Sequence, residues 1–332
     1  MSDTIRISVV VPVYNVKDFV PHAIQSLKAQ TFKELECIIV DDGTTDGTSD
    51  VIRNEIGDDS RFRHLKIEHS GYGRACNEGI RNASGNYVAI YEPDDLLESD
   101  FYECLAVHAQ EHPDVDVFRY NGFYKLNGAK KSISYDCSAR FTEKEMKRYG
   151  YKRIWRFHPS VFNGMYKKSF ILEHKIAMCE TEGASYQDVP FMVSLFYSNP
   201  MLFVINQAKY LYVLHKTQSI KFPAKKLEAV FRNWELERSW MIEQGYRNKG
   251  YYNYKMLMHL FYLALKIDDS QDLQRIYSYV AQKHRSVFFH LSRVTPLYQR
   301  LMCRFFYLMA RFRQKDSQDG STSESSDSRT GK

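Results

Sequence analysis

Long apolar runs and paired cysteines are both absent from this 332-residue sequence. No run approaches the roughly 20 apolar residues that a membrane-spanning helix needs, so we expect a soluble or peripheral protein. The six cysteines are scattered without any C-x-x-C spacing, at Cys37, Cys76, Cys104, Cys137, Cys179 and Cys303. Several of them lie in apolar runs. That distribution favours buried free thiols in a reducing compartment over disulfides or a zinc site.

Signals for export and for the common phosphate-binding loops are missing as well. Residues 1–4 lead directly into an apolar segment, and no signal peptide pattern precedes it. We therefore expect a cytoplasmic protein, with peripheral attachment to the cytoplasmic face of a membrane as an alternative. The first apolar segment is followed neither by a Walker A loop nor by G-x-G-x-x-G. This argues against a P-loop NTPase and against an ordinary dinucleotide-binding oxidoreductase.

The composition is that of an ordinary globular protein, with 44% hydrophobic residues, 26% charged residues and a net charge of +6. The length allows one large core, or one domain with a smaller appendage.

Short apolar segments alternate with helical patterns along the first hundred residues. The pattern predicts strands at 5–13, 37–40, 65–67 and 87–91, and helices at about 20–27, 49–56 and 74–82. This alternation predicts an α/β fold with a mostly parallel sheet and helices on both faces. In such sheets, ligands bind beyond the C-terminal ends of the strands.

Polar side chains follow three of these strands at that edge. They are Tyr14 and Asn15 after the first strand, Asp41 and Asp42 after the second, and Glu92, Asp94 and Asp95 after the fourth. Three carboxylates at one strand end repel one another unless a cation lies among them, and a hard divalent cation suits oxygen ligands best. The alternative is a solvated acidic turn that caps a helix beginning near Leu96.

The ordered motifs of the first hundred residues are specific as a set. VVVPVYN and IIVDDGTTDGT come first, G-x-G-x-A-x-N and A-x-G-N-Y follow, and EPDD comes last. In this order they resemble the nucleotide-binding half of a family 2 glycosyltransferase, an inverting enzyme of the GT-A fold and of the type that builds bacterial surface polysaccharides.

The resemblance implies two sets of site residues. The nucleotide would be bound by Pro12, Tyr14, Asn15, Asp41, Asp42, Asn77, Glu92 and Asp94. A Mn²⁺ or Mg²⁺ on the sugar-nucleotide diphosphate would be held by Asp94, Glu92, Asp95 and His215. A histidine in the position of His215 is also commonly an ordinary surface residue.

Two residues depart from the family pattern. The usual first aspartate of the acidic motif is Glu92 here, which is longer by one methylene but keeps a carboxylate. The usual arginine before Asn77 is Cys76, so one expected cation is absent, and Arg74 is a candidate to replace it.

A second acidic motif lies further along the chain, at Gln187-Asp188-x-x-Phe191. It resembles the family motif that carries the general base, so the resemblance implies that Asp188 removes the proton from the acceptor hydroxyl. The alternative is that Asp188 caps the helix that starts near Pro190.

The last third of the chain changes in composition. We expect a glycosyltransferase domain at 1–222 (nucleotide-sugar binding at 1–100, acceptor side at 101–222), a helical, basic and aromatic region at 223–315, and a disordered tail at 316–332. The segment 283–315 holds eight Lys or Arg residues and no acidic residue. A helix at 297–312 would place Leu301, Met302, Phe305, Leu308, Met309 and Phe312 on one broad face. Such a helix suits an anionic membrane surface, or alternatively docks on the catalytic domain or on a second subunit.

The sequence therefore predicts an inverting glycosyltransferase. It would use a nucleotide-diphospho-sugar, most commonly a UDP-sugar in enzymes of this kind, a divalent metal, and a glycan or lipid-linked glycan acceptor. A sugar nucleotidyltransferase and a non-catalytic nucleotide-sugar-binding subunit are the alternatives. Nucleic-acid binding by the basic segment is not expected, since no recognised module accompanies it.

Overall fold

The computed structural model describes residues 4–128, 130–135, 159–184, 186–216, 226–246, 250–282 and 305–310. The chain divides into two compact units, Met1–Gln218 and Ser219–Lys332. The predicted boundary after residue 222 falls among residues outside the described ranges, as does the predicted tail at 316–332.

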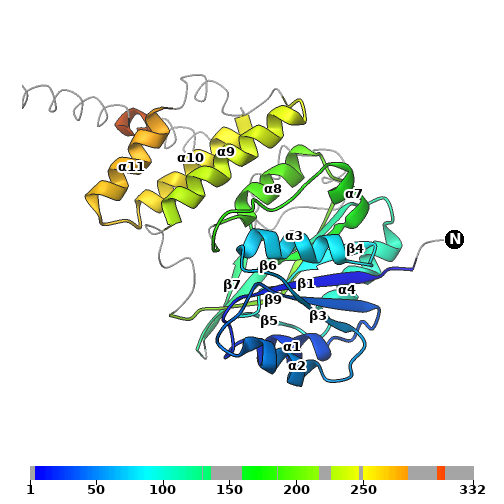
Figure 1. Ribbon diagram of the computed structural model, residues 1–332. Helices are drawn as coiled ribbons and strands as arrows, with labels where there is room; N and C mark the ends of the chain where they lie inside the picture. The colour runs from blue at the N-terminus through cyan, green and yellow to red at the C-terminus, as the bar shows by residue number, and fades with distance from the viewer. Residues whose placement is uncertain are drawn as a thin grey trace, which may run out of the picture. The chain divides into compact units, whose positions relative to one another are not determined.

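The first unit is built around one sheet (Figure 1). Its strands are β1 (Ile7–Val13), β2 (Leu35–Asp41), β3 (Phe62–Lys66), β4 (Tyr87–Ile90), β5 (Leu96–Leu97), β6 (Val117–Asn127), β7 (Lys130–Tyr135), β8 (Gly164–Lys167) and β9 (Leu202–Val213). Its helices are α1 (Val20–Lys28), α2 (Thr48–Ile56), α3 (Tyr72–Asn82), α4 (Phe101–Glu111), α7 (Lys168–Glu173) and α8 (Asp188–Tyr197).

The strand order is β3-β2-β1-β4-β8-β6-β9-β5, with β7 paired to β6. The strands of the first hundred residues, β3, β2, β1 and β4, pair in parallel, as the sequence predicts. Beyond β4 the sheet is mixed: β8 is antiparallel to both β4 and β6, while β6 and β9 run parallel. The predicted α/β fold is confirmed, and β3, β2, β1 and β4 form an uninterrupted parallel run in the nucleotide-binding half implied by the motifs.

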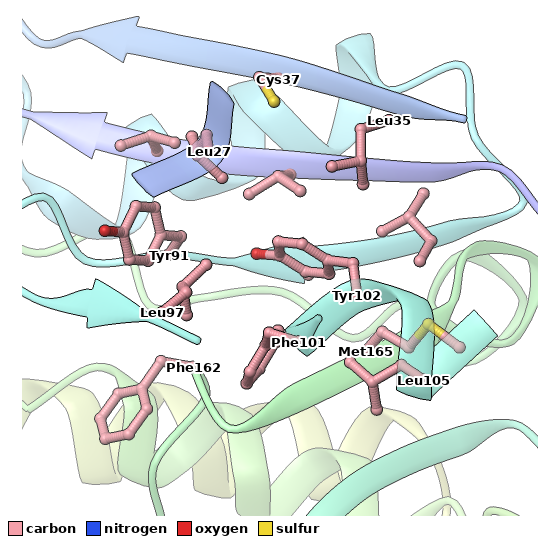
Figure 2. Packing of buried hydrophobic residues seen from close by; sticks show 14 of the residues in the cluster. Leu27, Leu35, Cys37, Tyr91, Leu97, Phe101, Tyr102, Leu105, Phe162 and Met165 are labelled. Atoms are coloured by element: carbon pink, nitrogen blue, oxygen red, sulfur yellow. The ribbon is translucent and has the colours of Figure 1, made fainter. Parts of the chain in front are cut away.

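Both faces of the central strands are covered, which explains their continuous apolar sequence. Alternate residues of β1, such as Val9 and Val11, pack with Ile24 of α1 and Leu105 of α4 in one core cluster. Figure 2 shows part of this cluster, including side chains from α1, α4 and β8. On the opposite face, a Cβ added to Gly79 of α3 would lie 2.2 Å from Cγ1 of Val10, so the glycine allows α3 to lie directly on the sheet.

The second unit is helical. It contains α9 (Leu227–Glu243), α10 (Gly250–Ala264), α11 (Ser270–Ala281) and the helical residues 305–310. Trp234 is fully buried, and its indole N–H donates to Nδ1 of His259 at 3.3 Å. No helix in the described ranges is both long enough and apolar enough to cross a bilayer.

Residues 305–310 are the described part of the predicted basic amphipathic helix. Phe306, Tyr307 and Ala310 are buried, and the Phe306 ring packs edge-on against Phe261 of α10. Phe305 and Leu308 are both 64% exposed, and they lie on the face that the sequence predicts to be apolar. The helix is thus apolar on two sides, and one of them packs within its own unit.

Candidate active site

The parallel strands deliver their C-terminal residues to one edge of the sheet. The backbone N–H of Asp42, just beyond β2, donates to the carbonyl of Val13 at the end of β1, at 2.9 Å. The N–H of Tyr91, just beyond β4, donates to the carbonyl of Val10 in β1, also at 2.9 Å. The three polar strand ends therefore lie side by side, as the topology predicts. Pro12, an expected nucleotide contact, is buried within β1 opposite Val40.

Asp41 stabilises its own loop. Its carboxylate is fully buried and accepts hydrogen bonds from the N–H of Thr44 at 2.9 Å and from the Ser49 hydroxyl. Nε2 of His64 lies 3.3 Å away. Although burial raises its pKa, these hydrogen bonds hold the pKa of Asp41 below the ordinary value. With both oxygens engaged, Asp41 is not exposed at the strand-end edge.

Asp42 is also enclosed, but it organises the loop after β3. It is 2% exposed, and it accepts from the backbone N–H groups of Ser70 and Gly71 at 2.8 and 2.9 Å. Its carboxylate and its backbone carbonyl also lie 2.9 and 3.0 Å from Nδ1 of His69. Asp42 thereby fixes the position of the imidazole.

The His69 ring stacks on the ring of Tyr14, with centroids 4.0 Å apart and planes inclined by 17°. Both side chains remain accessible: Tyr14 is 44% exposed and the His69 side chain 47%. Asn15 adopts a positive φ of 50° and accepts from the N–H of Thr45 at 2.9 Å, so its amide links the loops after β1 and β2. Sequence reasoning identified Tyr14 and Asn15 but missed His69.

Glu92 is partly buried just beyond β4. Its Oε1 accepts a 2.5 Å hydrogen bond from the hydroxyl of Tyr72, in the first turn of α3. Burial raises the pKa of Glu92 to about 8; the Tyr72 hydrogen bond lowers it, and the charges of Asp94 and Asp188 raise it. The effect of Asp188 indicates that the acidic motif after β4 lies close enough to the start of α8 for the carboxylates to interact.

Asp94 and His215 are paired at the same edge of the sheet. Oδ2 of Asp94 lies 2.7 Å from Nε2 of His215, and the side chains are 29% and 17% exposed. The His215 ring also packs on Phe19, with ring centroids 4.7 Å apart. The two residues come from positions 121 apart in the chain, and the structure brings them together as the resemblance implies.

Asp95 differs from the expectation that it is a metal ligand. It is 1% exposed, and its two oxygens accept from the Tyr210 hydroxyl at 2.7 Å and from the N–H of Val213 at 2.8 Å. The Tyr91 hydroxyl donates to its backbone carbonyl at 2.6 Å. Asp95 therefore ties the acidic motif to β9.

The donor set fits a divalent cation bound jointly with a diphosphate. No group of three or more His, Cys, Asp or Glu side chains within the described ranges could hold a metal by itself. Mg²⁺ sites of enzymes that act on nucleotides, however, commonly use one or two carboxylates together with phosphate oxygens and water. Asp94 and His215 would offer two adjacent ligand atoms, and Glu92 a nearby carboxylate.

Asp188 opens α8, and its Oδ1 accepts from the N–H of Val189 at 2.9 Å. Burial raises the pKa of Asp188 to about 7, against the lowering effect of these backbone hydrogen bonds. The preceding Gln187 is buried and donates to the carbonyl of Gly183 at 2.9 Å and to the hydroxyl of Thr181 at 3.1 Å. The amide of Gln187 thus fixes the loop that leads to the carboxylate.

Asn77, an expected nucleotide contact, connects the two halves of the site. Its amide donates to the carbonyl of Met178 at 3.0 Å and to Oε1 of Glu180 at 2.9 Å, and its oxygen accepts from the N–H of Met178 at 2.9 Å. A Cβ on Gly73 would lie 2.0 Å from the carbonyl oxygen of Cys179. Helix α3 therefore holds residues 178–183, which lead to Asp188.

The cysteine at the usual arginine position lies inside this contact region. Cys76 is fully buried beside Tyr72, and the charges of Glu92 and Asp188 add to the burial that raises the pKa of its thiol. Arg74 does not replace the missing cation here: its side chain is 51% exposed, with Nε 4.0 Å from Glu78. The Tyr72 contact could not be predicted from sequence, because Tyr72 and Glu92 are 20 residues apart.

A cavity of about 450 Å³ lies at the opposite end of the sheet, where β4 begins, and its lining includes Asn86, Lys167 and Lys168. Both lysine ammonium groups donate to backbone carbonyls, of Pro113 and Ala83. This cavity does not include the strand-end residues, and its lining contains no Asp or Glu.

Comparison with known proteins agrees with this architecture. The model of glycosyl transferase family 2 matches residues 8–174. The uncharacterised glycosyltransferase YibD of Escherichia coli is 30% identical over 224 residues, covering 65% of this chain and 64% of that protein. The chain spans less than two thirds of the length of the curated relatives that it matches.

Solved structures share the fold at low identity. Staphylococcus aureus TarS 1–349, in complex with UDP-GlcNAc, superposes with a TM-score of 0.65 and 18% identity, over 94% of this chain and 92% of that one. A mannosyltransferase from Pyrobaculum calidifontis, in complex with GDP-Man and Mn²⁺, gives a TM-score of 0.52 and 16% identity, over 92% and 86% of the two chains.

Proposed function

The chain belongs to glycosyl transferase family 2, and on that premise we propose that it transfers a sugar from a nucleotide-diphospho-sugar to an acceptor hydroxyl with inversion. The observation that carries this proposal is the shared cluster of Glu92 and Asp188, one from the end of β4 and one from the start of α8. In the proposed reaction, Glu92 serves the donor diphosphate and Asp188 serves the attacking hydroxyl as its base.

Asp188 acts as that base. Its pKa of about 7 lies near neutral pH, where a general base is both substantially ionised and basic enough to accept a proton. It removes the acceptor proton as the oxygen attacks the anomeric carbon from the face opposite the leaving nucleotide. A single displacement of this kind inverts the anomeric configuration, through a transition state with oxocarbenium character.

Asp94 and His215, with Glu92 beside them, would hold Mn²⁺ or Mg²⁺. A bound divalent cation supplies positive charge that stabilises the departing diphosphate. The short hydrogen bond from Tyr72 holds the Glu92 carboxylate in one orientation.

A UDP-sugar is the donor we favour, because the TarS structures with this fold contain UDP-GlcNAc and UDP. The transferred group would then be a hexosyl or N-acetylhexosaminyl unit. A glycan or lipid-linked glycan is the acceptor class, in the synthesis of a surface polysaccharide such as capsule or lipopolysaccharide.

The test has two readouts. Thermal-shift titration with nucleoside diphosphates and their sugars, with Mn²⁺ present, should show stabilisation by UDP or a UDP-sugar. Release of UDP from the stabilising UDP-sugar, with and without a hydroxyl acceptor, then tests transfer. A sugar nucleotidyltransferase would instead form pyrophosphate from a nucleoside triphosphate and a sugar phosphate, and a non-catalytic subunit would bind the donor without turnover.

Membrane attachment through the region 283–315 extends this proposal to an acceptor at the cytoplasmic face. Its support is the exposure of Phe305 and Leu308 in a segment without acidic residues. The full chain should bind vesicles of anionic lipid, and a variant with Phe305 and Leu308 both replaced by Ser should bind them less. Unchanged binding by that variant would contradict attachment through this face.

A further inference from the structure

Tyr186 combines an unfavourable backbone conformation with a position two residues before the proposed base. Its φ is 61°, in the left-handed region, where the Cβ of a bulky residue crowds its own backbone. Within the described ranges, the other residues with a positive φ that are not glycine are Asn15, Lys175 and Asn199.

Those three residues have local reasons for the left-handed conformation, whereas Tyr186 has none. Asparagine adopts it more readily than other residues that carry a Cβ, because its short polar side chain can bond to the local backbone. Lys175 directly follows the C-cap of α7, where helices commonly end in this conformation. Tyr186 is neither an asparagine nor a helix end, since it precedes α8, which begins at Asp188. Contacts with other parts of the fold must therefore hold it.

The backbone on both sides of Tyr186 is fixed by hydrogen bonds. The carbonyl of Tyr186 accepts from the N–H of Val189, in the first turn of α8, at 3.3 Å. The next residue, Gln187, is buried and donates from its amide to the carbonyl of Gly183 at 2.9 Å. That carbonyl also accepts from the N–H of Tyr72 in α3, at 3.3 Å. A strained residue persists when its surroundings are fixed in this way.

The side chain of Tyr186 lies within electrostatic range of the Asp188 carboxylate. Burial raises the pKa of Tyr186 to about 12, and the negative charge of Asp188 raises it as well. The phenol oxygen is itself buried. Because the N–H of Val189 already holds Oδ1 of Asp188 at 2.9 Å, the ring adds a second constraint on the carboxylate.

We propose that Tyr186 is a positioning residue, whose left-handed backbone places its ring against Asp188 and so orients the carboxylate to take the acceptor proton. The strained conformation is kept because relieving it would move the ring away from the base. The inference rests on the proposed function, since it assumes that Asp188 is the base. It adds a residue outside the Gln187-Asp188-x-x-Phe191 motif.

Three substitutions separate the ring from the backbone conformation. Tyr186→Phe keeps the ring, Tyr186→Ala removes the ring but keeps a Cβ, and Tyr186→Gly removes both. Turnover is measured as UDP release by the full-length protein from the UDP-sugar that stabilises it, with Mn²⁺ and with water as the acceptor. Tyr186→Phe should stay within about threefold of wild type. Tyr186→Ala and Tyr186→Gly should lose about 10- to 100-fold in turnover, while the Kd for UDP changes less than about threefold.

Thermal unfolding of the same variants measures the strain. Tyr186→Gly should melt about 2 °C or more above Tyr186→Ala, because both lack the ring and only alanine keeps a Cβ in the left-handed region. Lys175→Gly and Lys175→Ala are the matched controls at the exposed left-handed position after α7. The glycine variant should again melt above the alanine variant, and both should keep wild-type turnover.

Wild-type turnover in Tyr186→Ala and Tyr186→Gly, or equal losses in Tyr186→Phe and Tyr186→Ala, would overturn the role of the ring. Equal melting temperatures for Tyr186→Ala and Tyr186→Gly would overturn the role of the strain. Both results leave the proposed function standing. Wild-type protein that binds the UDP-sugar without releasing UDP to any hydroxyl acceptor or to water would instead contradict the proposed function.

Discussion

The hydroxyl of Tyr72 lies 2.5 Å from Oε1 of Glu92, and this contact joins the first turn of α3 to the end of β4. This hydrogen bond gives a physical reason for a glutamate in place of an aspartate at position 92, because the phenol holds the longer side chain in one orientation. Cys76 lies one helical turn after Tyr72. Its small side chain leaves room for the Tyr72–Glu92 pair, whereas an arginine would place a large cation beside it.

Tyr72→Phe should lower the turnover number roughly tenfold while changing the KM for the donor less than threefold. The variant removes one hydrogen bond to a carboxylate, an interaction of about 1.5–3 kcal/mol, and leaves the ring in place. Steady-state kinetics with the donor varied measure the two effects. Tyr87→Phe, which removes a 3.4 Å hydrogen bond to Val115 at the other end of β4, is the control. Equal losses in both variants would point to a general packing effect.

Asp188→Asn should reduce transfer by about 10²- to 10⁴-fold, the usual contribution of a general base. The amide keeps the size of the side chain but cannot take a proton. Donor affinity, measured by titration with UDP, should stay within about threefold of wild type. Turnover at the wild-type rate would remove Asp188 from the mechanism.

The pH dependence follows from the raised pKa of Asp188, about 7 in the free protein. The base is active only as a carboxylate, so kcat/KM should fall about tenfold per pH unit below that value and level off above it. Measuring kcat/KM for the acceptor from pH 5.5 to 8.5 at constant ionic strength tests this. A flat profile over that range would contradict catalysis by a perturbed carboxylate.

Substitution of Asp94 should affect metal binding, whereas substitution of Asp95 should affect stability. Asp94→Ala should abolish the effect of Mn²⁺ on UDP affinity and change the free energy of unfolding little, because its side chain is 29% exposed. Asp95→Ala leaves the Tyr210 hydroxyl and the Val213 N–H without their acceptor. That should cost about 2–4 kcal/mol of unfolding free energy. UDP titration with and without Mn²⁺ measures the first effect, and urea unfolding measures the second. If Asp95→Ala abolished the Mn²⁺ effect and Asp94→Ala lowered the free energy of unfolding, the roles assigned to the two residues would be wrong.

Gly73→Ala should disturb the acceptor side of the site from within α3. The new methyl group would lie 2.0 Å from the backbone oxygen of Cys179, so the segment that leads to Asp188 must move. We expect a loss of about 1–3 kcal/mol in stability and a larger relative loss in transfer than in UDP binding. Arg74→Ala, at the exposed neighbouring position, is the control. If Gly73→Ala matches wild type in all three measurements, the tight contact has no functional role.

Much of the parallel half of the fold could be predicted from sequence, because strands buried on both faces have continuous apolar runs. The strand ends at Tyr14, Asp42 and Asp94 followed from that periodicity and the topology. The shift of the third strand from 65–67 to Phe62–Lys66 reflects its edge position, where half-buried residues such as His64 weaken the apolar signal.

The partners of polar side chains were harder to predict. Nothing local distinguishes Asp94 from Asp95; their roles differ because Tyr210 and Val213 on β9 take both oxygens of Asp95. His69 and Tyr72 were missed because their partners lie 20 or more residues away. Hydrogen bonds of that span depend on the assembled fold rather than on sequence periodicity.

The contact of Gly73 with the backbone of Cys179 also restricts how this chain could be recombined with its relatives. A chimera joined near residue 100 would separate α3 from the segment that it supports, and an incoming segment with a different backbone path would collide with the helix. Grafts that seek a new acceptor should therefore exchange α3 and residues 178–191 together. Under the proposed function, the segments that determine the acceptor are then separated in the gene, although they are adjacent in space.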